Sequence, residues 1–169
     1  MTSRGAEGRT PSAPLRLDLL RHGAASPAGP DGDSVRPLSP AGRDAIERLA
    51  ARFAREGWRP EALWSSPLER ARETAAILAG ACPGLEIGIL EALAPESEPA
   101  QVIADLVTRG ATRHVVLVGH QPLLGRLVAY LTGASERGVP AGGLVRLAFP
   151  GALARGSATL EMELRPEST

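Results

Sequence analysis

The sequence contains three short motifs whose residue types could bind and transfer a phosphoryl group. Arg21-His22-Gly23 directly follows one apolar run, Gly119-His120 directly follows another, and Arg70 comes shortly after a third. A phosphoryl group in transfer carries negative charge on its oxygens, and the forked donors of arginine match two of those oxygens at once. A neutral imidazole adds a lone pair that can attack phosphorus. These residues therefore predict an anion site with its own nucleophile.

His22 is the residue to which we assign the nucleophilic attack. Its neighbour Gly23 is expected to let the backbone approach a ligand closely, because glycine has no side chain. Flanking positive charge is expected to lower the pKa of His22 and keep the ring neutral. A hydrogen bond from one ring nitrogen to a backbone carbonyl would turn the other nitrogen toward phosphorus.

Three further side chains are predicted to hold the phosphoryl group around this nucleophile. Arg21 and Arg70 would bind its oxygens, and His120 would donate a hydrogen bond to them. A fourth residue, Arg36, has two open interpretations: a cation at the rim of the site, or the partner of Asp33 in a structural ion pair.

Apolar runs and helix-start signals predict the elements that must position these residues. Short apolar runs typical of strands in a mostly parallel sheet stand at residues 15–20, 62–65, 85–90 and 115–118. Apolar residues at helical spacing predict helices over residues 39–57, from 67 onward, over 99–109 and over 123–131. Two alternating stretches, 144–149 and 158–164, predict an antiparallel pair.

The alternation of strands and helices indicates an α/β fold: a three-layer α/β/α sandwich around a mostly parallel central sheet with an antiparallel edge. In open α/β sheets, ligands bind at the carboxyl ends of the strands. Each motif follows such a strand end, so His22, Arg70 and His120 are expected to converge there. His114 precedes a strand instead, and we expect it to be exposed and outside the site.

Two helix starts carry capping signals. Ser39 is a typical N-cap for the helix that follows it. Ser66 and Glu69 fit a capping box, in which each side chain bonds the backbone N–H of the other residue. The helix that carries Arg70 is therefore predicted to begin at Pro67.

Composition narrows the class of protein. The chain has 169 residues, 19 basic and 19 acidic residues, and one cysteine. Balanced charge gives no signal for nucleic acid, one cysteine excludes an internal disulfide, and the apolar runs are too short to cross a membrane. We expect a cytoplasmic protein without a nucleic-acid or membrane partner, with a disordered segment at residues 1–14 and a single domain at 15–169.

The three ordered motifs resemble the histidine phosphatase superfamily, which is also called phosphoglycerate mutase-like. They are Arg21-His22-Gly23, then Ser65-Ser66-Pro67 with Arg70 and Thr74, then Gly119-His120. The short chain and the stretch 33–38, with sequence DSVRPL, are similar to the SixA-type phosphohistidine phosphatases of that superfamily. The resemblance covers roughly residues 15–131.

This resemblance implies a phosphoglycerate mutase-like fold and a covalent phosphohistidine at His22, with Arg21, Arg70 and His120 as the phosphate pocket. It implies no metal cofactor, and the sequence has no cluster of metal-ligating residues that would suggest one. SixA-type enzymes remove phosphate from the histidine of phosphotransfer domains. A phosphorylated phosphotransfer protein, or else a small phosphoester, is the expected substrate, and the expected state is a monomer or weak dimer.

The proton donor is the least specified part of the predicted site. Larger relatives use a glutamate after the third strand, for which Glu91 is the nearest match and Asp33 the second. Phosphohistidine is more labile than an alkyl phosphate, so its hydrolysis could proceed with a weak acid or none.

Two alternative functions remain open from the sequence. A small-molecule phosphomonoesterase of the same superfamily would need Glu91 as a working acid. A non-catalytic module would bind phosphate without forming a covalent adduct. A mutase would need a larger enclosed pocket than the short loops predict.

Overall fold

The structure is a computed structural model that describes residues 13–110 and 113–166. Its strands are β1 (Leu15–Arg21), β2 (Ala62–Ser65), β3 (Ile87–Ile89), β4 (His114–Gly119), β5 (Leu144–Phe149) and β6 (Thr159–Leu164). Its helices are α1 (Pro40–Arg55), α2 (Glu69–Gly80), α3 (Pro99–Thr108), α4 (Leu123–Thr132) and the short 3-10 helix η1 (Glu91–Leu93). Residues 1–12 of the predicted disordered segment 1–14 lie outside the described residues.

The strands form one six-stranded sheet in the order β3-β2-β4-β1-β5-β6. Strands β3, β2, β4 and β1 pair in parallel, β5 runs antiparallel to β1, and β6 runs antiparallel to β5. The predicted mostly parallel sheet with an antiparallel edge is therefore confirmed.

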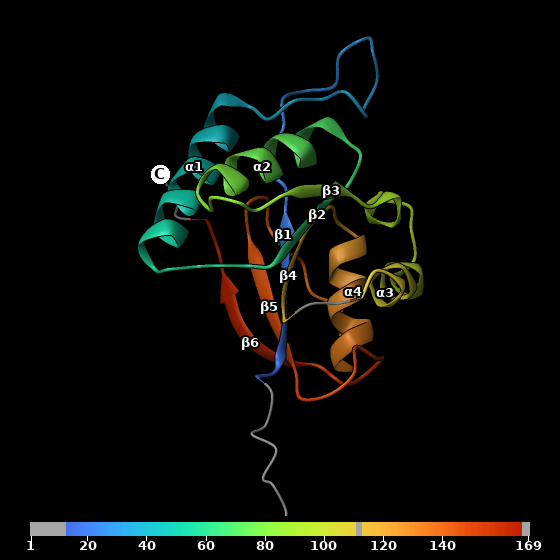
Figure 1. Ribbon diagram of the computed structural model, residues 1–169. Coiled ribbons are helices and arrows are strands. Elements are labelled where there is room, and N and C mark those ends of the chain that lie inside the picture. The colour runs from blue at the N-terminus through green and yellow to red at the C-terminus, as the bar shows by residue number, and fades with distance from the viewer. Residues whose placement is uncertain (1–12, 111–112, 167–169) are drawn as a thin grey trace, which may run out of the picture.

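Two helical layers cover the sheet, with α1 and α2 on one face and α3 and α4 on the other (Figure 1). Side chains of β1 alternate between the two faces, as the pleat of a strand requires. Leu17 and Leu19 join the apolar core under α3 and α4, whereas Leu20 joins the core under α1 and α2. Apolar side chains on both faces explain why the central strands read as nearly continuous apolar runs.

Strand register brings the three motifs to one edge of the sheet. Arg21 at the end of β1 pairs with Gly119 at the end of β4, and Ser65 at the end of β2 pairs with Val118. The backbone N–H of His22 continues the ladder and donates to the carbonyl of Gly119 at 3.1 Å. Parallel pairing with β4 at the centre therefore places the strand ends beside each other.

The helix starts agree with the sequence at α1 and differ at α2. Ser39 caps α1 by accepting a hydrogen bond from the N–H of Gly42 at 3.0 Å. Helix α2 begins at Glu69 rather than at Pro67, and no side chain caps its first turn. The predicted capping box is therefore wrong, because the N–H of Glu69 donates to the carbonyl of Ser34 at 3.0 Å. The Ser66 hydroxyl accepts from the N–H of Leu68 at 3.3 Å and lies 2.7 Å from a ring nitrogen of His120.

The prediction that His114 is exposed is also wrong. Its side chain is 17% exposed, and its Nε2 lies 2.8 Å from the carboxylate of Asp18. Asp18 is fully buried and also accepts hydrogen bonds from Arg146 and from the indole N–H of Trp58. A buried carboxylate needs hydrogen-bond partners of this kind. The position of Asp18 within an apolar run did not show which residues they would be.

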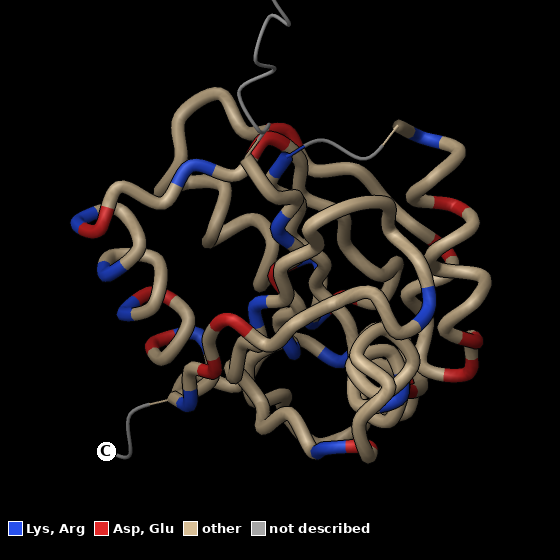
Figure 2. The backbone as a smooth tube through the Cα atoms, turned by 90° about the horizontal axis from the view of Figure 1, so that it is seen from below, with Lys and Arg blue, Asp and Glu red and all other residues tan. Residues whose placement is uncertain are grey.

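Charges of both signs are interspersed over the molecule, as Figure 2 shows. This distribution agrees with the equal numbers of acidic and basic residues in the sequence. Among the described residues, no helix is both long and apolar enough to cross a membrane.

Candidate active site

His22 lies directly after β1 and is held in a defined orientation. Its side chain is buried, with 7% of the residue exposed. Nδ1 lies 2.7 Å from the backbone carbonyl oxygen of Gly23, which can only accept a hydrogen bond. Nδ1 therefore carries the proton in the neutral ring, and the lone pair is on Nε2.

Burial lowers the pKa of His22 to about 4, and the positive charges of Arg70 and Arg21 add to this effect, although the hydrogen bond to Gly23 opposes it. The sequence predicted the direction of this shift from the charges alone. Burial is the larger cause, because an apolar environment disfavours the charged imidazolium. At neutral pH His22 is consequently uncharged.

Arg70 projects from the first turn of α2 toward Nε2 of His22 and donates a hydrogen bond to it. Its Nε lies 3.3 Å from Nε2 of His22. Its Nη1 donates to the carbonyl of Asp33 at 2.8 Å, and its Nη2 donates to the Asp33 carboxylate at 2.9 Å. The guanidinium is thus held at its outer end by Asp33 while its Nε faces His22.

Thr74 joins this helix to the strand end that carries His22. Its hydroxyl donates to the carbonyl of Arg70 at 2.7 Å and accepts from the N–H of Gly23 at 3.1 Å. From the sequence, Thr74 was expected only as part of the second motif, and no contact was predicted for it. Its buried position one turn after Arg70 on α2 explains how it links the two segments.

His120 follows β4 and lies against His22, with the ring centroids 4.9 Å apart. Its Nε2 is hydrogen-bonded to the hydroxyl of Ser66 at 2.7 Å. Burial, then the proximity of His22 and Arg70, lowers the pKa of His120 to about 3. Its other ring nitrogen, Nδ1, is buried and has no hydrogen-bond partner among the described residues.

Arg21 completes the group at the end of β1. Its Nη1 donates to the backbone carbonyl of Val139 at 3.1 Å. Its Nε is buried and, within the described residues, has no hydrogen-bond partner. Burial and the nearby charge of Arg70 lower the pKa of Arg21.

Two guanidinium groups and two neutral imidazoles are therefore gathered at one edge of the sheet. Buried polar atoms are normally hydrogen-bonded, so the unpartnered Nε of Arg21 and Nδ1 of His120 indicate unused bonding capacity. Arg70 is paired with Asp33, whereas the described residues give Arg21 no carboxylate partner. Arginine charge beside a neutral imidazole lone pair is an arrangement that can bind a phosphoryl group and accept it.

Gly23 has a packing reason for lacking a side chain. A Cβ atom there would lie 2.8 Å from Ile46 Cγ1 and 2.9 Å from the backbone oxygen of Gly42, both in α1. The N–H of Gly23 is already bonded to Thr74. The close approach at Gly23 is to helix α1, and direct contact between Gly23 and a ligand stays a prediction.

Arg36 forms the structural ion pair that was one of its two interpretations. Its Nη1 lies 2.8 Å from the carboxylate of Asp33, and its Nε donates to the carbonyl of Ser26 at 2.8 Å. Arg36 thus supports Asp33, which in turn holds Arg70. Sequence reasoning did not find this indirect link to the site, because it depends on how the loop closes over α2.

The two candidate proton donors differ in their surroundings. Hydrogen bonds from Arg36 and Arg70 lower the pKa of Asp33 despite some desolvation, so its carboxyl is ionised at neutral pH. Glu91 begins η1, is separated from the end of β3 by one residue, and is exposed. Among the described residues, no hydrogen bond joins Glu91 to the two histidines.

Metal-ligating side chains do not gather at this edge. Within residues 13–110 and 113–166, no group of three or more His, Cys, Asp or Glu side chains is placed to hold a metal ion.

Comparison with known sequences identifies the family. A sequence model of the histidine phosphatase superfamily (branch 1) matches residues 17–95, which include the first two motifs. An uncharacterized protein from Picosynechococcus sp. is 39% identical over 114 residues, which are 66% of this chain and 69% of that protein.

Solved structures agree with this assignment. The protein histidine phosphatase SixA complexed with tungstate is 25% identical, with a TM-score of 0.78 over 90% of this chain and 97% of that one. A protein from Agrobacterium tumefaciens, provisionally identified as the phosphohistidine phosphatase SixA, is 27% identical, with a TM-score of 0.77 over 92% of this chain and 100% of that one. The chain belongs to the histidine phosphatase superfamily and is a phosphatase.

Proposed function

We propose that this phosphatase removes the phosphoryl group from phosphohistidine in a protein, by way of a covalent phosphohistidine at His22. The observation that carries the proposal is the state of His22. Its Nδ1–H is bonded to the Gly23 carbonyl, its pKa is lowered to about 4, and its Nε2 lies 3.3 Å from the guanidinium of Arg70. A neutral, oriented imidazole beside an arginine is prepared for attack on a phosphoryl group.

In the first step, Nε2 of His22 forms a bond to phosphorus while the bond from phosphorus to the substrate imidazole breaks. The His22 ring keeps its Nδ1 proton, so phosphorylation makes it a cation hydrogen-bonded to the Gly23 carbonyl. The substrate ring leaves as a neutral imidazole when its far nitrogen carries a proton. Arg21, Arg70 and His120 would stabilise the negative charge on the transferring oxygens.

In the second step, water attacks phosphorus and the bond to Nε2 of His22 breaks. The oxygen of water ends in inorganic phosphate, its proton passes to phosphate or solvent, and His22 returns to the neutral form with the proton on Nδ1. Both phosphorus–nitrogen bonds that break have an imidazole as leaving group, so the two steps have similar chemical demands.

The surroundings of the two carboxylates favour phosphohistidine over a phosphate ester. An alkoxide leaving group needs a proton from an acid in reach, whereas a protonated imidazole ring leaves without one. Asp33 is ionised between Arg36 and Arg70, and Glu91 is exposed. The two similar SixA structures, one of a protein histidine phosphatase and one provisionally identified as a phosphohistidine phosphatase, point to the same substrate class.

The proposal is tested by comparing kcat/KM for a histidine-phosphorylated phosphotransfer domain with kcat/KM for aryl and sugar phosphates. We expect clear preference for the phosphoprotein, and a Glu91→Gln variant with an unchanged rate on it. Equal or better turnover of the esters, with collapse in the Glu91→Gln variant, would instead establish a phosphomonoesterase that uses Glu91 as its acid.

A further inference from the structure

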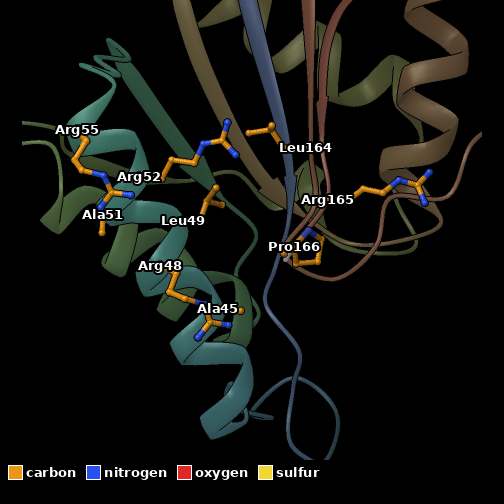
Figure 3. A pocket seen from close by; sticks show the side chains of 10 residues that line it. Ala45, Arg48, Leu49, Ala51, Arg52, Arg55, Leu164, Arg165 and Pro166 are labelled. Atoms are coloured by element: carbon orange, nitrogen blue, oxygen red, sulfur yellow. The ribbon is translucent and has the colours of Figure 1, made fainter. Parts of the chain in front are cut away.

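A groove between helix α1 and the end of edge strand β6 is lined by arginines that take no part in the site described above (Figure 3). Its volume is about 210 Å³, and its lining includes Arg48, Arg52, Arg55 and Arg165 but no acidic residue. Three of these arginines belong to α1 and recur at helical spacing, so they stand on one side of the helix. In Figure 3, Arg52 extends from α1 toward Leu164 at the end of β6.

The positive charge of this groove is only partly balanced. Arg52 pairs with Glu56 at 2.7 Å, and Arg165 pairs with Glu163 at 3.3 Å. Arg48 and Arg55 are exposed, and the described residues give neither of them a carboxylate partner. Exposed ion pairs such as Arg52–Glu56 contribute little free energy to the fold.

The remaining lining of the groove is apolar. Leu49 on α1 and Leu164 at the end of β6 are half-buried, and Pro166 lies beside them. Half-buried aliphatic side chains next to guanidinium groups are complementary to a partner segment that carries both carboxylates and an apolar side chain. Such a combination is typical of the rim and centre of a protein interface.

One wall of the groove is joined to the strand end that carries the nucleophile. Gly142 lines the groove, and its N–H donates to the backbone carbonyls of both Arg21, at 3.1 Å, and His22, at 3.0 Å. This wall of the groove is therefore fixed relative to the strand end that carries His22.

We propose that this groove binds an acidic segment of the phosphoprotein substrate while the phosphorylated histidine of that protein reaches His22. The inference rests on the proposed function and adds the surface that selects the partner. The cluster around His22 contacts a phosphoryl group, which every phosphohistidine shares, so selection among partners requires contacts elsewhere. Charge complementarity at such a surface mainly raises the rate of productive encounter and the specificity.

A nucleic acid fits this groove less well than an acidic protein segment. A nucleic acid binds along a continuous basic stripe, with aromatic side chains where single strands are bound. The groove is short, it has no aromatic residue in its lining, and charges of both signs are interspersed over the molecule (Figure 2).

The test compares an Arg48→Glu, Arg55→Glu double variant with the wild-type protein on a panel of histidine-phosphorylated phosphotransfer domains of differing net charge. N-phosphoimidazole serves as a small substrate that reaches His22 without touching the groove. The matched control is Arg113→Glu, Arg155→Glu, which makes the same charge change at two exposed positions outside the groove. A milder Arg48→Gln, Arg55→Gln variant provides the same comparison if the charge reversal reduces folding.

We expect the wild-type protein to prefer the more acidic domains, and the groove variant to lose tenfold or more in kcat/KM on them. Its turnover of N-phosphoimidazole should be unchanged, and the control should behave as wild type. Equal kcat/KM values for the groove variant and wild type on every phosphoprotein would overturn the groove while leaving the proposed function in place. Failure of the wild-type protein on all phosphoproteins, with N-phosphoimidazole still hydrolysed, would overturn the proposed protein substrate and the groove together.

Discussion

Nε of Arg70 lies 3.3 Å from Nε2 of His22, while both terminal nitrogens of the same guanidinium are bonded to Asp33. Asp33 therefore fixes the direction of Arg70 from outside the site. The Arg70 side chain is 7% exposed, and that of Asp33 is 56% exposed. Asp33 therefore lies on the solvent side of Arg70, where it acts as a positioning residue.

Replacing Asp33 by alanine should disturb Arg70 without removing it. We expect an Asp33→Ala variant to lose roughly tenfold in kcat/KM and to bind vanadate more weakly, because a misplaced binding group costs about this much or more. Asp33→Asn, which keeps a side-chain acceptor and the backbone bond, should lose less. Asp31→Ala, an exposed change in the same loop, is the matched control and should behave as wild type.

The lowered pKa of His22 predicts activity that persists into mildly acidic solution. Nucleophilic attack needs the neutral ring, and the pKa of about 4 keeps His22 neutral down to that pH. The acidic limb of the kcat/KM profile on N-phosphoimidazole should therefore lie near pH 4, after correction for the substrate's own titration. A limb near pH 6.5, the value of an ordinary histidine, would show that His22 is not held as described.

Protein stability should nevertheless fall over that same acidic range. His22 and His120 have pKa values of about 4 and 3 in the folded protein and bind protons near pH 6.5 when unfolded. The unfolded chain thus binds more protons below pH 6.5, so the free energy of unfolding decreases as the pH is lowered. Between pH 7.5 and 5 the expected loss is about 4 kcal/mol, measured by urea denaturation.

A control variant isolates this effect from the carboxylates. Asp18 and Asp33 have lowered pKa values, so their contributions are lost only below the ordinary value of 3.8 and do not enter the interval from pH 7.5 to 5. A His120→Gln variant starts from a lower stability but should show about half of the wild-type pH dependence. An unchanged slope in that variant would contradict the assignment.

Asp18 should matter for stability far more than for chemistry. It is fully buried, and Arg146 and His114 both depend on it for a partner. Removing one member of a buried ion pair costs about 3–5 kcal/mol, so Asp18→Ala should lower the free energy of unfolding by about that amount. The exposed pair of Arg16 and Glu161 gives the comparison, since Glu161→Ala should cost less than about 1 kcal/mol. Folded Asp18→Ala protein should keep its kcat.

Much of the site could be predicted because it depends on local sequence and on a general property of parallel sheets. His22 and His120 each follow an apolar strand, and strands β1 and β4 pair in register. Strand ends of a parallel sheet lie at one edge, so the two histidines had to be near each other once the strands were adjacent.

The parts that could not be predicted depend on side chains from distant segments. Ser66, which was predicted to be a helix cap, bonds His120 from the end of another strand, and α2 starts two residues later than the capping signal indicates. His114 is partly buried because its side chain bonds Asp18, which lies on the neighbouring strand. Asp33 reaches Arg70 only through closure of a loop whose composition specifies no conformation.

The most direct test of the account is to trap the covalent intermediate. The protein would be mixed with ³²P-labelled N-phosphoimidazole, quenched with alkali within milliseconds, and mapped by peptide digestion. We predict a label on His22 that is stable in base and lost in acid, and no label in a His22→Asn variant, whose turnover should fall by at least about a thousandfold. Turnover at the wild-type rate in that variant, or a label on another residue, would contradict the account.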